Sequence, residues 1–174
     1  QFTAKDYNQL KSWTRYSVKN ARKVIAIAEH TKKDIIREYG KKAEDIAVTP
    51  LAYDKKLFKS TSNLIRQPFI LYLGSLKPSK NIEGLVRAFA KLSLTDLPVG
   101  TQLVIAGKKA WMYDKIYELV RSLKLEGKVD FRGFIEEEEK PVLMGGAQAF
   151  VMPSFYEGFG LPVLEAMACG TPVV

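Results

Sequence analysis

The sequence predicts a doubly wound α/β domain, in which a parallel sheet is covered by helices on both faces. Short apolar runs rich in β-branched residues alternate with segments of helical periodicity, and the connections between them are short. Glycines follow several of the apolar runs, as expected where a strand ends in a tight turn. In such sheets a ligand binds beyond the carboxyl ends of the strands, so the loops that follow strands are the candidate functional regions.

The alternation is most regular after residue 67. Strands are predicted at Phe69–Leu73, Leu103–Ala106, Val129–Phe131 and Ala149–Pro153, and another begins at Val173. Helices are predicted from their apolar stripes at Ile82–Leu94, Tyr113–Leu125, Glu136–Met144 and Val163–Ala168. The loops to inspect for function are then Gly74–Asn81, Gly107–Trp111, Arg132–Ile135 and Ser154–Leu161.

The first fifty residues predict a smaller strand–helix–strand unit. Val24–Ala28 and Ile46–Thr49 are short apolar runs typical of buried strands. Between them, Thr31 is predicted to cap a helix over Lys32–Tyr39, and Gly40 to end it.

Residues 51–67 lack periodicity and are rich in Lys, Ser, Thr and Asn, a composition typical of a linker. We therefore predict the tail of one domain over residues 1–50, an interdomain linker over 51–67, and a ligand-binding domain over 68–174. The chain opens on Gln1 and closes inside a predicted strand, so we expect a truncated fragment.

Composition limits the possible function classes. Of 174 residues, 47% are hydrophobic and 26% charged, which is ordinary for a globular protein. The longest apolar runs are too short to span a bilayer, and the only cysteine, Cys169, excludes an internal disulfide and suggests a reducing compartment. The net charge of +8 favours anionic partners, but the basic residues are spread out, so no nucleic-acid surface is expected.

The segment Pro153–Val174 carries the richest chemistry. A strand leads into a loop that contains Glu157 and two glycines, and a helix begins near Leu161. Glycines let the backbone approach a ligand, and the free N–H groups at a helix start can hold phosphate oxygens. Glu165, one turn into an apolar helix, is suited to accept hydrogen bonds from a vicinal diol such as a ribose, and Glu157 from sugar hydroxyls.

Glu157 and Glu165 are separated by seven residues in the text EGFGLPVLE, which AMACGTPVV follows. This pattern strongly resembles the signature of the group 1 glycosyltransferases, which are retaining enzymes of the GT-B fold that use nucleotide-diphosphate sugars. YLGSLKPSKNIEGLVRAFAKL and VIAIAEHTKKDIIREYG resemble other parts of that family, so the likeness runs from about Trp13 onward. It implies a Rossmann-like GT-B C-terminal domain, preceded by the end of the N-terminal domain and incomplete at its own C-terminus.

The resemblance implies roles for individual residues. Lys80 and Glu157 would be catalytic: Lys80 would stabilise the leaving diphosphate, and Glu157 would bind the donor sugar. Glu165 would bind the ribose, and the Arg132–Ile135 loop would line the nucleobase. The implied nucleotide-sugar site comprises Gly74, Ser75, Lys80, Ile135, Glu157, Gly158, Phe159, Gly160, Leu161 and Glu165.

One position departs from the common family pattern. Many members carry Arg directly after the first glycine of this domain, where this chain has Ser75. We therefore expect phosphate binding to depend on Lys80, helped by Lys77 or Lys108; a lysine is a point charge and cannot reproduce the bidentate fork of an arginine.

Other kinds of site have little support. There is no D-x-D triplet, and one His and one Cys cannot make a zinc site, so we expect neither a metal nor another cofactor. His30 is interpreted as a structural or surface residue. Phe155, Tyr156 and Trp111 are interpreted as packing residues rather than sugar platforms.

The expected partners are a nucleotide sugar and an acceptor glycan or lipid-linked glycan held by the missing domain, so the fragment alone should be nearly inactive. We expect a cytoplasmic protein, peripheral to the inner face of the membrane if the basic surface docks there. The segments GSLKPSKN and AGKKAW resemble members that build bacterial surface polysaccharides, often from mannose-type donors. The alternatives are a GT-B-fold epimerase or phosphorylase, and a non-catalytic nucleotide- or anion-binding module.

Overall fold

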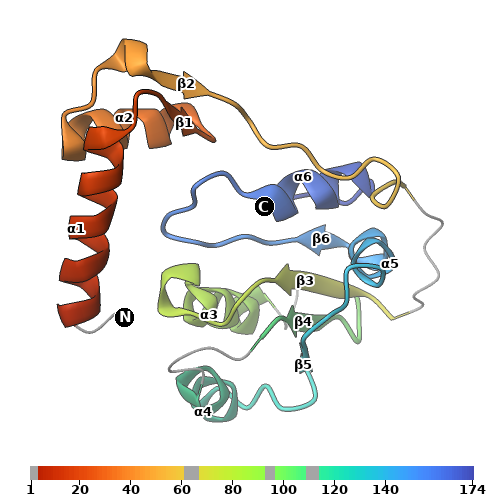
Figure 1. The fold of residues 1–174 in the computed structure, drawn as a ribbon. Helices are drawn as coiled ribbons and strands as arrows, with labels where there is room; N and C mark the ends of the chain where they lie inside the picture. Colours follow the sequence, from red (N-terminus) through yellow and green to blue (C-terminus); the bar gives the residue numbers. More distant parts are fainter. Residues whose placement is uncertain (1–3, 61–66, 93–96, 109–113) are drawn as a thin grey trace. The chain divides into compact units, whose positions relative to one another are not determined.

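The computed structural model describes residues 4–60, 67–92, 97–108 and 114–174 (Figure 1). The chain divides into two compact units, Gln1–Ala52 and Tyr53–Val174. Phe58 is buried in the core of the second unit, so part of the stretch with a linker-like composition packs against the ligand-binding domain.

The first unit pairs two short parallel strands and carries two helices. The strands β1 (Val24–Ala26) and β2 (Ile46–Val48) align Val24 with Ile46, and both were predicted. The helix α2 (Glu29–Tyr39) connects them through a short 3-10 turn, η1 (Ala43–Asp45). The helix α1 (Ala4–Asn20) was not predicted, because most of its residues are polar and only Val18 is buried among its described side chains.

The predicted cap of α2 was wrong, whereas its predicted end is confirmed. Thr31 lies inside the first turn, since the helix follows Ala28, whose backbone is extended. The N–H of Lys32 donates to the Ala28 carbonyl at 3.0 Å, which starts the helical ladder three residues earlier than expected. Gly40 ends the helix in the left-handed conformation, with its N–H bonded to the Ile36 carbonyl.

The second unit contains the predicted parallel sheet. Its strands run in the order β5-β4-β3-β6, and every pair is parallel. Val173 bridges to Phe150 on the far side of β6, which confirms the strand predicted at the end of the chain. The strands are β3 (Phe69–Leu73), β4 (Gln102–Ala106), β5 (Val129–Gly133) and β6 (Ala149–Phe150).

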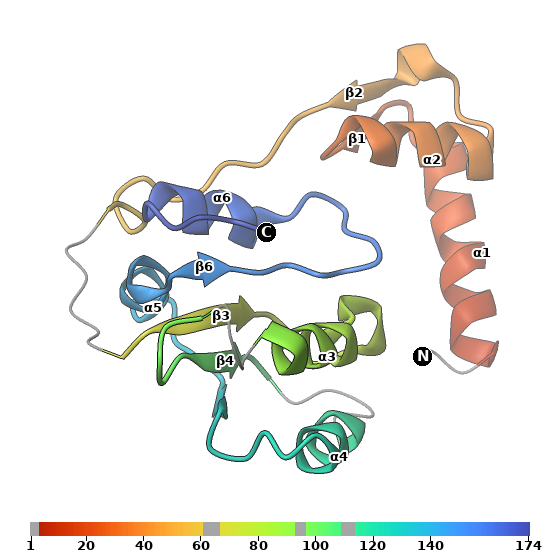
Figure 2. The same ribbon diagram turned by 180° about the vertical axis from the view of Figure 1, so that it is seen from behind.

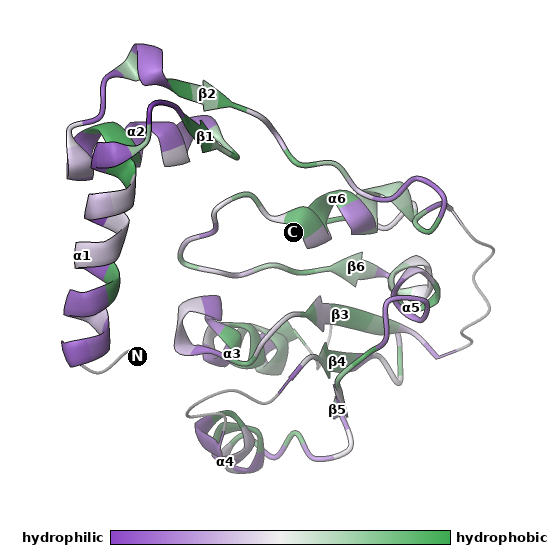
Figure 3. Ribbon diagram, in the orientation of Figure 1, coloured by the Kyte–Doolittle hydropathy of each residue, from purple (hydrophilic) through white to green (hydrophobic). Residues whose placement is uncertain are grey.

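Helices cover both faces of this sheet, so the doubly wound architecture is confirmed (Figure 2). Alternate residues of β3 divide between the two cores: Tyr72 packs with α3 and α4, whereas Leu71 and Leu73 pack with α5 and α6. Figure 3 shows that β3 and β4 are almost entirely hydrophobic, as expected for strands buried on both faces. The helices are α3 (Ile82–Leu92), α4 (Asp114–Ser122), α5 (Lys140–Gly146) and α6 (Leu161–Ala168).

The helix predicted at Glu136–Met144 begins only at Lys140. Residues 136–139 form an exposed turn, in which the Glu136 N–H donates to the Glu139 carboxylate at 3.1 Å. Four adjacent carboxylates repel one another in a helical turn, whereas Pro141 is well suited to the first turn of a helix. The strand predicted at Ala149–Pro153 is also shorter, since β6 ends at Phe150.

Two glycines bring the ends of β3 and β4 together. The Gly74 N–H donates to the Ala106 carbonyl at 2.9 Å, and the Gly107 N–H donates to the Gly133 carbonyl at 2.6 Å. A Cβ on Gly107 would overlap the carbonyl group of Gly74, and Gly107 has a φ of +144°. This position therefore needs glycine for both its conformation and its space.

Gly107→Ala is expected to lower the free energy of unfolding by roughly 2–4 kcal/mol, from backbone strain plus steric overlap. Gly127→Ala is the matched control, since Gly127 also has positive φ but nothing lies within 4 Å of its added Cβ. The control should lose only about 1 kcal/mol. Chemical denaturation of both variants checks this, and equal losses would contradict the packing argument.

Candidate functional site

The candidate site lies where the strand order of the sheet reverses. β3 and β6 are neighbours although the chain between them also forms β4 and β5. Their carboxyl ends therefore place the loop after Leu73 beside the loop after Phe150, and the N–H of Phe155 donates to the Ser79 carbonyl at 3.1 Å. Ligands of doubly wound folds bind at this kind of switch point.

Lys80 and Glu157, the predicted catalytic pair, meet between these loops. Lys80 ends a short 3-10 turn, η2 (Pro78–Lys80), and its Nζ lies 2.5 Å from Oε1 of Glu157. Their side chains are 24% and 27% exposed, so the pair is accessible to a ligand but not fully solvated. The structure thus brings together two residues that are 77 positions apart.

A cavity of about 140 Å³ opens beside this ion pair. Both loops contribute to it, and so does the start of α6. Its lining contains six of the predicted site residues, together with Ser154 and the buried Tyr72, which were not predicted. The predicted residues in this lining are Gly74, Ser75, Lys80, Glu157, Gly160 and Leu161, of which Lys80 and Glu157 form the ion pair itself.

The start of α6 faces this cavity with an uncapped helix end. Gly160 precedes the helix with φ +92°, and no side chain caps the N-terminus. Pro162 occupies the first turn, where the missing N–H costs no helical hydrogen bond. Backbone N–H groups at such an end favour a negatively charged ligand.

Glu157 is held as a carboxylate. Burial alone would raise its pKa, but the hydrogen bond from Lys80, together with the neighbouring Ser154 hydroxyl, leaves the pKa below its usual value. Under the pair lies Tyr72, whose hydroxyl donates to the Ser75 carbonyl at 3.1 Å. Burial and the Glu157 charge raise the pKa of Tyr72, so it stays neutral and serves as a hydrogen-bond donor.

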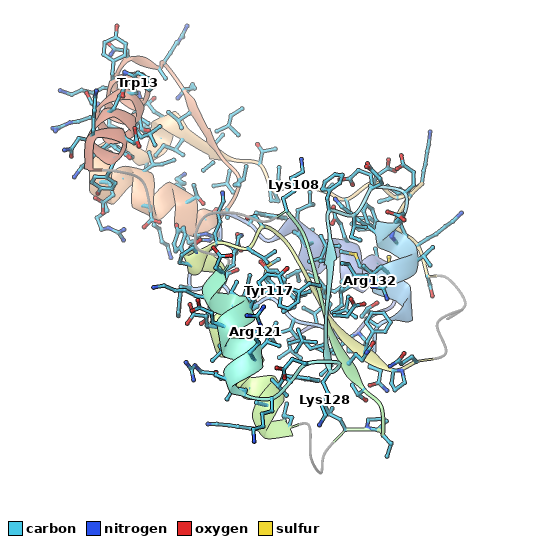
Figure 4. All side chains as sticks on the ribbon, turned by 90° about the horizontal axis from the view of Figure 1, so that it is seen from below. Trp13, Lys108, Tyr117, Arg121, Lys128 and Arg132 are labelled. Carbon is cyan, nitrogen blue, oxygen red and sulfur yellow. The ribbon has the colours of Figure 1, made fainter. Side chains whose placement is uncertain are left out.

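A second cavity of about 230 Å³ adjoins the first and shares Leu73, Gly74 and Ser75 with it. Ile135, predicted to line the nucleobase, is part of its wall, and so is Lys140. Lys108, labelled in Figure 4, extends over the ring of Phe134 with its Nζ 4.5 Å from the centroid. Lys108 thus lines the same cavity as Gly74 and Ser75, whereas Lys77 does not, and the helper role of either lysine stays a prediction.

Glu165 is the most buried of the predicted ligands, at 7% exposure. Burial raises its pKa, while the Lys140 charge partly offsets this effect and Glu137 adds to it. Glu165 lines neither cavity, and nor do Gly158 and Phe159. The binding of a ribose by Glu165 thus stays a prediction. Lys140, whose charge acts on Glu165, also lines the second cavity.

Several other residues fall outside this site. Cys169 is buried in the core between the sheet and α6, and His30 is exposed on α2. Within the described residues, no three His, Cys, Asp or Glu side chains gather as metal ligands do, and no helix has the length and apolar character to cross a bilayer. Trp111 lies outside the described residues.

The interpretation of Phe155 and Tyr156 as packing residues was wrong. Both residues are exposed, Phe155 at 74% and Tyr156 at 59%. The sequence pattern gave no signal for this exposure, because the loop between β6 and α6 has no periodicity that separates buried from exposed positions.

The two glutamates should affect stability with opposite pH dependence. The lowered pKa of Glu157 stabilises the fold at neutral pH, and this contribution is lost as the pH falls through that pKa. The raised pKa of Glu165 gives a contribution that is present in acid and lost as the pH rises through it. Near neutral pH, Glu157→Gln should therefore lower the free energy of unfolding and Glu165→Gln should raise it.

Urea unfolding at neutral pH and at a pH below the usual glutamate range checks this, with the exposed Glu138→Gln as control. Both differences from the parent chain should shrink in acid. A pH-independent effect of either variant would show that its carboxylate charge is not the cause.

Comparison with solved structures places this architecture among sugar transferases. A sucrose-phosphate synthase of Thermosynechococcus elongatus superposes with a TM-score of 0.81 and 31% identity, over 95% of this chain and 43% of that one. Anabaena HepE, solved with UDP and glucose, superposes with a TM-score of 0.82. This superposition covers 95% of this chain and 47% of HepE, and because the sequences are only 24% identical the likeness shows the fold alone.

Sequence relatives agree. The chain is 33% identical to O-antigen chain mannosyltransferase B of Escherichia coli over 190 residues, covering 99% of this chain and 49% of the relative. It is 34% identical to mannosylfructose-phosphate synthase of Agrobacterium fabrum, covering 80% of this chain and 34% of the relative. The chain thus spans about half or less of the curated relatives that it matches.

The family profile described as glycosyl transferases group 1 matches residues 54–174, which is nearly the whole second unit. This match covers the strand order, the two cavities and the Lys80–Glu157 pair. The chain belongs to the group 1 glycosyl transferases.

Proposed function

We propose that the whole protein transfers a sugar from a nucleotide-diphosphate donor to an acceptor with retention of configuration, and that this chain binds the donor. The Lys80–Glu157 pair at the switch point carries the proposal. It supplies a cation and a carboxylate beside a helix N-terminus, in the wall of the first of two adjoining cavities. A nucleotide sugar carries the groups that these features would bind: a nucleoside, two phosphates and a polyhydroxyl ring.

The diphosphate would bind between Lys80 and the start of α6. Negative charge grows on the leaving phosphate as the sugar bond breaks, and a preorganised ammonium group and backbone N–H groups stabilise it. Since these groups supply the positive charge, we propose that donor binding requires no metal ion. The nucleoside would lie toward Ile135 and Lys140 in the second cavity, with its ribose hydroxyls on Glu165.

Glu157 would bind hydroxyls of the donor sugar. In the free chain its carboxylate neutralises Lys80, so diphosphate and Glu157 compete for one ammonium group. Binding of the donor would release the carboxylate toward the sugar, which then occupies the cavity next to Ser154. Lys80 would thus bind the leaving diphosphate and Glu157 the sugar, on the two sides of the bond that breaks.

The donor sugar we propose is mannose, and the product a bacterial surface polysaccharide or related glycan. Relatives named as mannosyltransferases support this, among them O-antigen chain mannosyltransferase RfbU of Salmonella typhimurium, which is 29% identical to this chain. An epimerase or phosphorylase of the same fold has no comparable support from these relatives.

Titration with UDP, GDP and ADP should identify the nucleobase of the donor. We expect saturable calorimetric binding of one of them to the full-length protein in the presence of EDTA. Lys80→Gln and Glu165→Gln should each weaken this binding about tenfold or more, because they remove contacts to the diphosphate and to the ribose. Glu157→Gln should preserve or strengthen it, since the competing carboxylate is lost.

The exposed Lys91→Gln, at the end of α3, is the control and should bind as the parent does. Mannosyl transfer to an acceptor, with the anomeric configuration assigned by NMR, then tests the reaction. Binding of no nucleotide, or equal binding by all variants, would contradict the proposed donor site. Salt-dependent binding of nucleic acid instead would favour the non-catalytic module.

We also propose that the protein works in the cytoplasm, at the inner face of the membrane. α1 supports this, because an exposed apolar half of the helix opposes a basic half, as in helices that lie in the membrane interface. Trp13, on the apolar half, is labelled in Figure 4. The apolar residues are Tyr7, Leu10, Trp13 and Tyr16, and the basic ones Lys5, Lys11, Arg15 and Lys19.

Sedimentation with vesicles checks this proposal. The full-length protein should bind phosphatidylglycerol-containing vesicles, and Trp13→Ser with Tyr16→Ser should reduce binding severalfold because two interfacial anchors are lost. Pure phosphatidylcholine vesicles are the control for the charge contribution. Unchanged binding by the double variant would mean that α1 is not the contact.

A further inference from the structure

A third cavity of about 230 Å³ is lined in part by the two loops that hold Lys80 and Glu157. It shares no residue with the two donor cavities. Its walls come from η2, from the first turns of α3 and α4, and from the loop after β6. The lining includes Lys77, Pro78, Asn81, Glu83, Lys115 and Phe155.

Phe155 presents an aromatic ring at this cavity. The side chain is 74% exposed, although its backbone is fixed by the hydrogen bond from its N–H to the Ser79 carbonyl. An exposed aromatic ring offers a large apolar surface with only two side-chain torsions to order when a ligand covers it. Pro78 continues the apolar surface on η2.

The polar groups around the ring are of mixed charge and type. Lys77 and Lys115 supply donors, Glu83 an acceptor, and the Asn81 amide both. Asn81 is held in the left-handed conformation at the start of α3, where Gly84 leaves room for its side chain. A sugar ring offers an apolar C–H face and a rim of hydroxyls that donate and accept, which matches an aromatic ring edged by such groups.

The position of the cavity relates it to the reaction. Lys80 lies in the same turn as Pro78, and Glu157 lies two residues after Phe155, so this cavity and the donor cavity take wall residues from the same two loops. An acceptor hydroxyl must approach the donor sugar held by these loops. A glycan that reaches that sugar therefore meets the loops that also line the third cavity.

We propose that the third cavity binds a sugar unit of the acceptor glycan, with Phe155 as its stacking platform. This inference rests on the proposed function and extends it, since acceptor binding is then shared by the domain that carries the donor site. The ligand class is a neutral oligosaccharide, because an aromatic ring edged by both donors and acceptors suits a sugar ring. Glu83 offsets one of the two lysines, and the other lysine can donate hydrogen bonds to sugar hydroxyls.

The test uses the full-length protein with methyl α-mannoside and α-linked mannotriose as probes. Saturation-transfer NMR should show binding of mannotriose in the presence of the nucleoside diphosphate. Phe155→Ala should weaken mannotriose binding, and raise its KM if transfer is measured, about tenfold. Phe155→Trp should retain binding, and the affinity for the nucleotide should be the same in all three proteins.

Val99→Ala is the matched control, because Val99 is a fully exposed apolar residue in the loop before β4, at the opposite edge of the sheet. Unchanged mannotriose binding and KM in Phe155→Ala, or an equal loss in Val99→Ala, would overturn the proposal. Failure to bind any nucleotide would instead count against the donor site, and the NMR measurement without nucleotide would still report whether Phe155 contacts the oligosaccharide.

Discussion

The pairing of β3 with β6 is the constraint on which the site depends. It reverses the direction in which the sheet grows, so two loops far apart in sequence emerge side by side at one edge. Lys80 comes from one loop and Glu157 from the other, and their ion pair forms only in this arrangement. Tyr72 supports it from the buried side, while the close contact between Gly74 and Gly107 fixes the end of β3.

In the free chain the charges of Lys80 and Glu157 offset each other, and a bound donor would change this balance. Lys80 lowers the pKa of Glu157, so this carboxylate is ionised before a ligand arrives. A diphosphate would take over Lys80 and leave Glu157 free for hydroxyl groups. Glu165 has no such ion pair among its described contacts, and its burial raises its pKa, so a neutral diol rather than a cation is a suitable partner.

Much of this arrangement could be predicted from the sequence. Apolar runs and glycines located every strand of the sheet, and the E-x7-E spacing located the loop and helix of the site. The features that the sequence pattern could not predict depend on packing between distant segments. Tyr72 has the same pattern as the other core residues of β3, and the exposure of Phe155 depends on the path of its loop. The apolar residues of α1 are exposed and outnumbered by polar ones, so they gave no signal of a helix packed on a core.

A crystal structure of the full-length protein with an unhydrolysable nucleotide-diphosphate mannose would test the central claim most directly. The account predicts that Lys80 Nζ leaves Glu157 and contacts a phosphate oxygen at the start of α6, with the nucleoside beside Ile135 and the sugar on Glu157. A donor bound elsewhere, or a diphosphate that leaves the Lys80–Glu157 ion pair intact, would contradict it.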